Sequence, residues 1–100
     1  MKIIDAHAHI GYIGGWADVG ITADGLIAQM DEYNIEKTVL CCEDNDITFD
    51  VMNKYPGRII GAVYVNPLVK KTVDFMEEYA NKGFKAVKLN PLRHAYCADA

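Results

Sequence analysis

Short apolar runs alternate along this chain with longer segments in which apolar residues recur every three to four positions. Short apolar runs are typical of buried strands, and the longer spacing is typical of helices. Strict alternation of the two predicts βαβ units around a parallel sheet. The expected strands are residues 2–8, 38–42, 59–65 and 86–89, and the expected helices lie between 22 and 34, between 46 and 55, and over 69–81.

Capping and breaking residues support these boundaries. Thr22 or Asp24 can cap the first helix, and Asn34 stands where a left-handed residue would end it. Pro56-Gly57 ends the second helix and Gly83 the third. No linker or internal repeat interrupts the pattern, so the 100 residues are expected to form one domain.

Composition places the chain among soluble globular domains. It is 51% apolar and 24% charged, and its apolar runs fall far short of the ~20 residues that span a bilayer. The start of the chain lacks the pattern of a secretory signal, which predicts a cytoplasmic protein. The net charge is −4 and the ten basic residues are dispersed, so neither a nucleic acid nor a membrane is expected as a partner.

Three cysteines, Cys41, Cys42 and Cys97, are too few and too badly spaced for a disulfide framework. Reduced thiols agree with a cytosolic setting. They could be metal ligands or nucleophiles, but the favoured interpretation is that they are small, partly buried packing residues.

Two histidines stand near the end of the first expected strand. Side chains alternate faces along a strand, so Asp5, His7 and His9 are predicted to share one face. Neutral imidazole is the commonest protein ligand for zinc, and the spacing allows both rings to converge on one ion. The alternative is a solvated strand end without function. A glycine-rich loop is expected to follow, over residues 11–20.

The carboxyl ends of parallel strands meet at one edge of the sheet, where α/β barrels and open α/β sheets carry their chemistry. Several other polar residues are expected at that edge beside His7 and His9, and this favours a metal site. They are Glu43, Asp44, Asn66, Lys88, Asn90 and His94.

Three segments together resemble the amidohydrolase superfamily of metal-dependent hydrolases. They are Asp5-Ala6-His7-Ala8-His9 with its glycine-rich loop, Asn66-Pro67 after the third strand, and Gly83-Phe84-Lys85-Ala86-Val87-Lys88-Leu89-Asn90-Pro91. The chain is most similar to the amidohydrolase-2 branch, which includes aminocarboxymuconate-semialdehyde decarboxylase.

The resemblance implies a (β/α)8 TIM barrel that holds a divalent metal, most often zinc, with His7 and His9 as ligands. It implies that metal-activated water attacks an amide, ester or related carbon of a small-molecule substrate, with decarboxylation as the alternative. In the family, the remaining ligands and the general base come from later strands, so no catalytic residue is assigned in this chain.

Length suggests an incomplete barrel. A full barrel needs ~250 residues, and the expected βαβαβαβ order is its first half. The chain is therefore expected to be an N-terminal portion, inactive alone. Alternatively, it is a half-barrel that associates with itself through exposed sheet edges, or a non-catalytic metal-binding module.

Further metal ligands within the chain are open to several interpretations. Asp5 is interpreted as an inner-barrel residue that can orient a histidine, and Glu43 and Asp44 as an acidic turn and helix cap. His94 is expected in a loop, where a solvent-exposed side chain is the favoured interpretation over a catalytic one. Cys97 is the remaining candidate.

Lys88 and Asn90 are expected to face the barrel lumen, because Val87 and Leu89 occupy the alternate positions. Lys88 could pair with a carboxylate such as Asp5, contact substrate, or carry the carbamate that bridges two metals in binuclear relatives. Trp16, with Tyr12, could form an apolar wall over the substrate or simply anchor the loop. The predicted substrate-binding residues are Lys88, Asn90 and Trp16.

Overall fold

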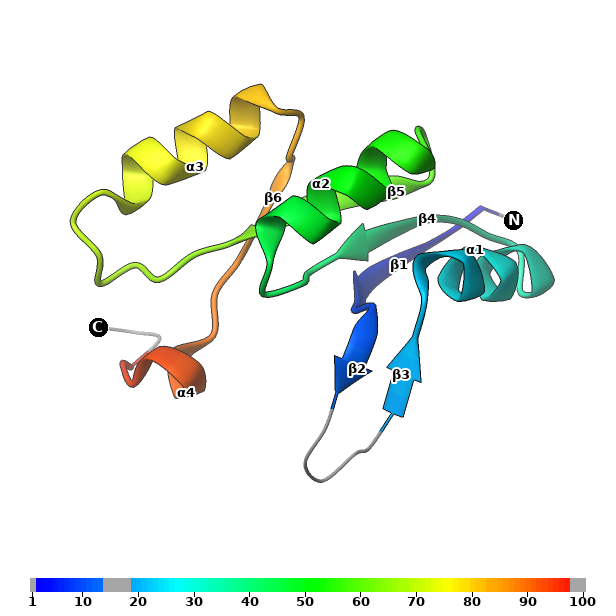
Figure 1. Cartoon of the computed structure of the whole chain (residues 1–100), viewed down its shortest axis with the longest axis horizontal. Coiled ribbons are helices and arrows are strands. Elements are labelled where there is room, and N and C mark those ends of the chain that lie inside the picture. The colour runs from blue at the N-terminus through cyan, green and yellow to red at the C-terminus, as the bar shows by residue number, and fades with distance from the viewer. Residues whose placement is uncertain (1, 14–18, 98–100) are drawn as a thin grey trace.

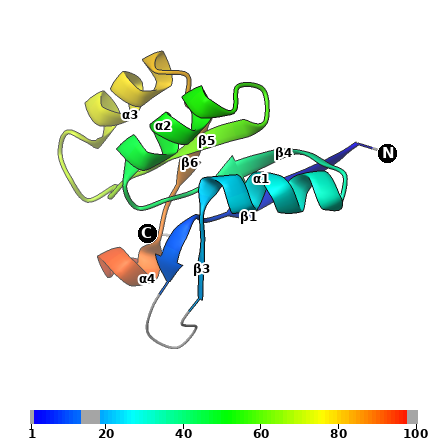
Figure 2. The same cartoon turned by 45° about the vertical axis from the view of Figure 1, so that its right-hand side comes forward.

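The computed structural model describes residues 2–13 and 19–97, and its main element is a four-stranded parallel sheet in the order β1-β4-β5-β6. Three helices connect consecutive strands and lie on one side of the sheet in both views (Figure 1, Figure 2). The strands are β1 (Ile3–Ala8), β4 (Ile35–Leu40), β5 (Ile59–Tyr64) and β6 (Ala86–Lys88), and the helices are α1 (Ala23–Glu32), α2 (Asn45–Lys54) and α3 (Thr72–Asn81). The predicted α/β class and βαβαβαβ order are confirmed.

Two elements were not expected. Strands β2 (Gly11–Ile13) and β3 (Val19–Ile21) pair antiparallel where the sequence predicted only a glycine-rich loop. Helix α4 (Pro91–His94) replaces the loop predicted after the fourth strand. Its start has a local cause, because the Asn90 side chain accepts a hydrogen bond from the Arg93 backbone N–H and Pro91 suits the first helical position. Both elements lie at the end of the sheet where its strands finish (Figure 1).

The predicted helix ends are largely confirmed by the backbone. Thr22 caps α1 by accepting a hydrogen bond from the Gly25 backbone N–H at 3.0 Å. Asn34 has φ 58° and Gly83 has φ 101°, the left-handed conformations that end helices. Helix α3 begins at Thr72 rather than at residue 69, because Asn66 holds the intervening residues in turns by bonds to Leu68 and Thr72.

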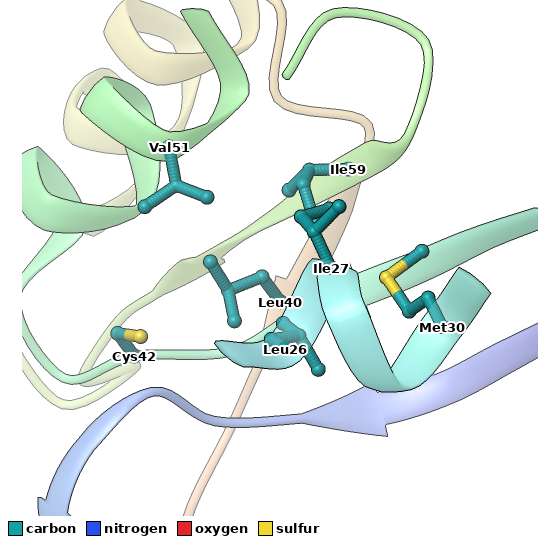
Figure 3. Close-up of a cluster of buried hydrophobic side chains, with 7 residues drawn as sticks. All are labelled: Leu26, Ile27, Met30, Leu40, Cys42, Val51 and Ile59. Atoms are coloured by element: carbon teal, nitrogen blue, oxygen red, sulfur yellow. The ribbon is translucent and has the colours of Figure 1, made fainter. Parts of the chain in front are cut away.

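The core lies between the sheet and the helices. Met30 of α1 and Leu40 of β4 are almost completely buried, at 1% and 0% exposure. Figure 3 shows the surrounding cluster, which joins α1, β4, α2 and β5: Leu26, Ile27, Met30, Leu40, Cys42, Val51 and Ile59. A second cluster fixes α3 and the start of β6 with Val63, Val65, Tyr79 and Phe84. These contacts hold the strands in place and so position their carboxyl ends.

The cysteines are all free. Cys41 and Cys42 are buried, as predicted for packing residues, but Cys97 is exposed, so the expectation of partial burial is wrong there. Cys97 lies just past α4, a four-residue helix that has no buried residue of its own. In the described ranges, no helix combines the length and apolar character that a bilayer crossing requires.

The two outer strands of the sheet, β1 and β6, have no neighbour on one side within the described residues. Both carry exposed apolar side chains, including Ile4 at 56% and Val87 at 47% exposure. A groove of ≈ 570 Å³ follows β6 and α3, lined largely by apolar residues such as Val63, Val73 and Met76. The sheet is thus open at both edges.

Candidate active site

His7 and His9 come together at the carboxyl end of β1. Their Nε2 atoms lie 2.8 Å apart and their ring planes meet at 69°. The pairing of β1 with β4 shifts register between Asp5 and Ala8, the kind of bulge that often re-aims side chains beside functional sites. The predicted convergence of the two rings is therefore observed, and their role as metal ligands stays a prediction.

The environment of His9 favours its neutral form. Burial lowers its pKa below the ordinary value of 6.5, and the neighbouring His7 and Lys88 lower it further. A hydrogen bond to the Cys41 backbone and the charge of Glu43 oppose this shift but do not reverse it. Neutral imidazole is the form that binds a metal, so His9 is prepared for ligation.

A cleft of ≈ 810 Å³ opens at the carboxyl ends of the strands and contains both histidines. Its walls come from the ends of β1, β4, β5 and β6 and the turns that follow them. The lining residues are His7, His9, Ile10, Gly11, Cys42, Glu43, Asp44, Ile47, Tyr64, Lys88 and Asn90. The topology thus gathers the histidines and the predicted substrate-binding pair Lys88 and Asn90 around one space.

Lys88 is half-buried in this cleft. Among the ion pairs of residues 2–13 and 19–97, none involves Lys88, so the predicted alternative of a pair with Asp5 is not observed. Asp5 instead accepts a hydrogen bond from the backbone N–H of His7 at 3.1 Å. Asp5 therefore orients the backbone at His7. The positive charge of Lys88 lies in the cleft without a carboxylate partner among the described residues.

Glu43 and Asp44 have the structural roles favoured from the sequence. The Asp44 side chain caps α2 by accepting a hydrogen bond from the Asp46 backbone N–H at 3.0 Å. Glu43 is exposed, and its Oε1 lies 3.7 Å from Nε of Arg93 in α4, a solvent-exposed ion pair between the turn after β4 and α4. Neither residue reaches the histidines as part of a ligand cluster.

His94 differs from its prediction. It lies in α4 rather than in a loop, and it is half-buried rather than solvent-exposed. Its ring packs edge-on against Tyr64 with centroids 5.5 Å apart, which shields it from water. His94 thus stands behind a residue that lines the cleft.

Sequence reasoning missed Tyr64 and the residue that fixes it, Asn45. The Asn45 side chain accepts a hydrogen bond from the Tyr64 backbone N–H at 2.7 Å and donates one to the Tyr64 carbonyl oxygen at 3.0 Å. Asn45 is buried at the start of α2. The only hint in the sequence is an asparagine immediately after a helix cap, which does not reveal its partner in a strand 19 residues away.

The two histidines fit part of a metal site. In a tetrahedral zinc site with bonds of about 2.0–2.1 Å, two ligand nitrogens lie about 3.3–3.4 Å apart. The two Nε2 atoms lie 2.8 Å apart, at hydrogen-bond distance, so a further separation of about half an ångström would let both bind one ion. A third ligand does not join them: the described part of the chain holds no group of three or more His, Cys, Asp or Glu side chains able to bind one ion. The candidates Asp5 and Cys97 are not brought into such a group. Trp16 lies outside the described residues.

Comparisons with known proteins place the fold. No family model matches the chain, and no curated protein sequence matches it. Two solved structures do match. A probable 2-pyrone-4,6-dicarboxylic acid hydrolase from Acinetobacter baumannii, solved with citric acid bound, is 23% identical with a TM-score of 0.66. A 4-oxalomesaconate hydratase from Rhodopseudomonas palustris is 22% identical with a TM-score of 0.63.

The matches cover 87% and 89% of this chain but only 37% and 41% of the two enzymes. The chain therefore spans about two fifths of their length. Both neighbours are TIM-barrel proteins of the amidohydrolase-2 type, the same type that the sequence motifs resemble. At this level of identity the likeness establishes the fold: the described sheet is the first half of a (β/α)8 barrel.

Proposed function

We propose that this chain contributes the first half of a metal-dependent hydrolase of the amidohydrolase superfamily, amidohydrolase-2 branch. The observation that carries the proposal is the His7–His9 pair, with 2.8 Å between its Nε2 atoms, at the carboxyl ends of the strands of a half-barrel. This is the end at which TIM barrels carry their active sites.

His7 and His9 would hold the divalent ion, most readily zinc. When bound, such an ion lowers the pKa of a water molecule or polarises a substrate oxygen. The names of both structural neighbours, a hydrolase and a hydratase, describe reactions that consume water. They favour water attack over the decarboxylation that the sequence resemblance left as an alternative.

The residues on the β6 side of the cleft suit a substrate that carries a carboxylate. Lys88, which has no ion-pair partner among the described residues, places its positive charge in the cleft with the histidines, and Asn90 lines the same space. One neighbour is named for a dicarboxylic acid and was solved with citric acid. In this proposal Lys88 holds a substrate carboxylate while Asn90 helps to position it, and Trp16 remains a proposed part of the substrate wall.

The described residues lack a third metal ligand, and no general base is assigned among them. We therefore propose that the 100-residue chain alone does not turn over substrate. The buried, free thiols of Cys41 and Cys42 agree with the proposed cytoplasmic location.

The open edges of the sheet support self-association. Exposed strand edges present unpaired backbone groups, and the apolar side chains Ile4 and Val87 lie on the two outer strands. A second copy that pairs its β1 with β6 would cover both. The alternative of a non-catalytic half-barrel shares this association and differs only in lacking substrate chemistry.

Assays of the purified chain with carboxylate-bearing esters and lactones, with and without zinc, test the function. No zinc-dependent turnover above background is expected from the chain alone. Turnover that requires zinc and disappears in His7→Ala would show that an assembly of this chain completes the site, and would overturn the proposed inactivity. Turnover that survives in both His7→Ala and His9→Ala would contradict the proposed metal site.

A further inference from the structure

Two residues that line the middle of the cleft lie between the histidine pair and Lys88. The histidine pair stands at the end of β1 and Lys88 at the end of β6, the two outer strands of the sheet. Ile47 is in the first turn of α2, which follows β4, and Tyr64 is the last residue of β5. A ligand that reaches from the proposed metal ion to Lys88 therefore passes over Ile47 and Tyr64.

The side chain of Ile47 is open to the cleft. It is 46% exposed, whereas Val51, about one turn further along the same helix, is 6% exposed and belongs to the core. Ile47 thus offers apolar surface to the cleft. A hydrocarbon that displaces water from such a surface gains free energy.

Tyr64 also presents mainly carbon to the cleft. Its hydroxyl oxygen has almost no accessible surface, so it is closed to a ligand. Its backbone N–H and carbonyl oxygen are both held by the Asn45 side chain. The surface that Tyr64 contributes is therefore apolar, like that of Ile47.

The two carboxylates in this part of the cleft have partners of their own. Asp44 caps α2, and Glu43 pairs with Arg93 of α4. Both are thus less available to accept hydrogen bonds from a ligand. The middle of the cleft suits carbon better than hydroxyl groups.

We propose that Ile47 and Tyr64 are specificity-determining residues that favour a carboxylate-bearing substrate with a hydrocarbon body, an inference that rests on the proposed function. Lys88 holds the carboxylate, and the carbon chain lies over Ile47 and Tyr64. A hydroxylated body is disfavoured, because its hydroxyl groups would leave water without gaining partners there.

Two dicarboxylates of equal chain length separate these cases. Adipate has only methylene groups between its carboxylates, and glucarate carries a hydroxyl group on each of the same carbons. Both are titrated into the metal-free, isotope-labelled full chain, which keeps chelation of zinc by glucarate out of the measurement. NMR of the isoleucine methyl groups gives the two affinities.

Adipate is expected to bind about tenfold or more tightly than glucarate, to shift the Ile47 δ1 methyl resonance, and to show nuclear Overhauser contacts with the Tyr64 ring. Ile47→Asn should reduce the preference to about threefold or less. Val73→Asn should leave it unchanged. This control is matched, because Val73 is 72% exposed in the first turn of α3 and is not among the described residues that line the cleft. Lys88→Met should weaken both ligands alike.

Equal affinity for adipate and glucarate, or a preference that Ile47→Asn leaves unchanged while circular dichroism shows a folded chain, would overturn the inference and leave the proposed carboxylate site intact. Binding of neither dicarboxylate would overturn both. Adipate binding without contacts to the Tyr64 ring would overturn the assignment of Tyr64. Zinc binding by His7 and His9 is measured separately, so failure of the metal proposal is distinguished from failure of this one.

Discussion

The Asn45 side chain makes the two backbone hydrogen bonds at Tyr64 that a neighbouring strand would otherwise make. It accepts one from the Tyr64 N–H at 2.7 Å and donates one to the Tyr64 carbonyl oxygen at 3.0 Å. The last residue of β5 is thereby fixed by the first residue of α2. A cleft residue is thus held by a side chain that does not itself line the cleft.

Replacement of Asn45 by alanine should destabilise the fold by about 1–3 kcal/mol, because two backbone groups of Tyr64 lose their partners in a half-buried place. Urea denaturation followed by circular dichroism measures this change. Asn53→Ala on the exposed side of the same helix is the control and should change stability by less than about 0.5 kcal/mol. Equal effects of the two variants would show that the Asn45 bonds contribute nothing.

Most of the fold was predictable, because its strands and helices follow local patterns of apolar residues in the sequence. The four parallel strands and the three connecting helices follow from apolar periodicity and from residues such as Asn34 and Gly83. The β2–β3 pair was missed because glycines in Gly11–Ile13 and Val19–Ile21 weaken the strand signal. Helix α4 was missed because four residues are too few to show a period.

The site was predictable only where neighbours in sequence are neighbours in space. His7 and His9 converge because they are two residues apart on one strand. Tyr64 contacts Asn45 and His94, and each of the three residues belongs to a different element. No spacing in the sequence predicts these contacts. Long-range relationships of this kind depend on the packing of α2 and α4 against the sheet.

The charge of Lys88 should act on His9 in the metal-free chain. His9 should titrate below 6.5, and Lys88→Met should raise its pKa by removing a positive neighbour, although burial and His7 still hold it down. Proton NMR titration of the imidazole signals measures the shift. Lys85→Met is the control, because Lys85 is exposed and is not among the causes of the His9 shift.

The lowered pKa of His9 also predicts how the stability of the fold depends on pH. The pKa of His9 is lower in the folded chain than the ordinary 6.5, so the unfolded chain binds more protons as the pH falls through that value. His9 therefore makes the fold less stable below about pH 6.5, and Lys88→Met should lessen that loss. A pH dependence that is identical in His9→Gln and the wild-type chain would show that other groups determine it.

Self-association should be visible by sedimentation velocity. At micromolar concentration the chain should sediment as a species heavier than its 11.1 kDa monomer, because β1 and β6 offer open apolar edges. Ile4→Lys and Val87→Lys should reduce the association by placing charges on those strands. Leu92→Lys, which alters a 93% exposed side chain outside the sheet, should not. A single 11.1 kDa species that unfolds cooperatively would contradict the association.

Zinc titration of the tag-free chain, followed by NMR of its ¹⁵N-labelled histidines, tests the central claim most directly. The account predicts that zinc shifts the Nε2 resonances of His7 and His9 together, and that His7→Ala or His9→Ala abolishes this binding. His94→Ala should retain it, because His94 lies outside the pair. Zinc that leaves the His7 and His9 resonances unmoved, or that binds equally to both alanine variants, would contradict the proposed metal site.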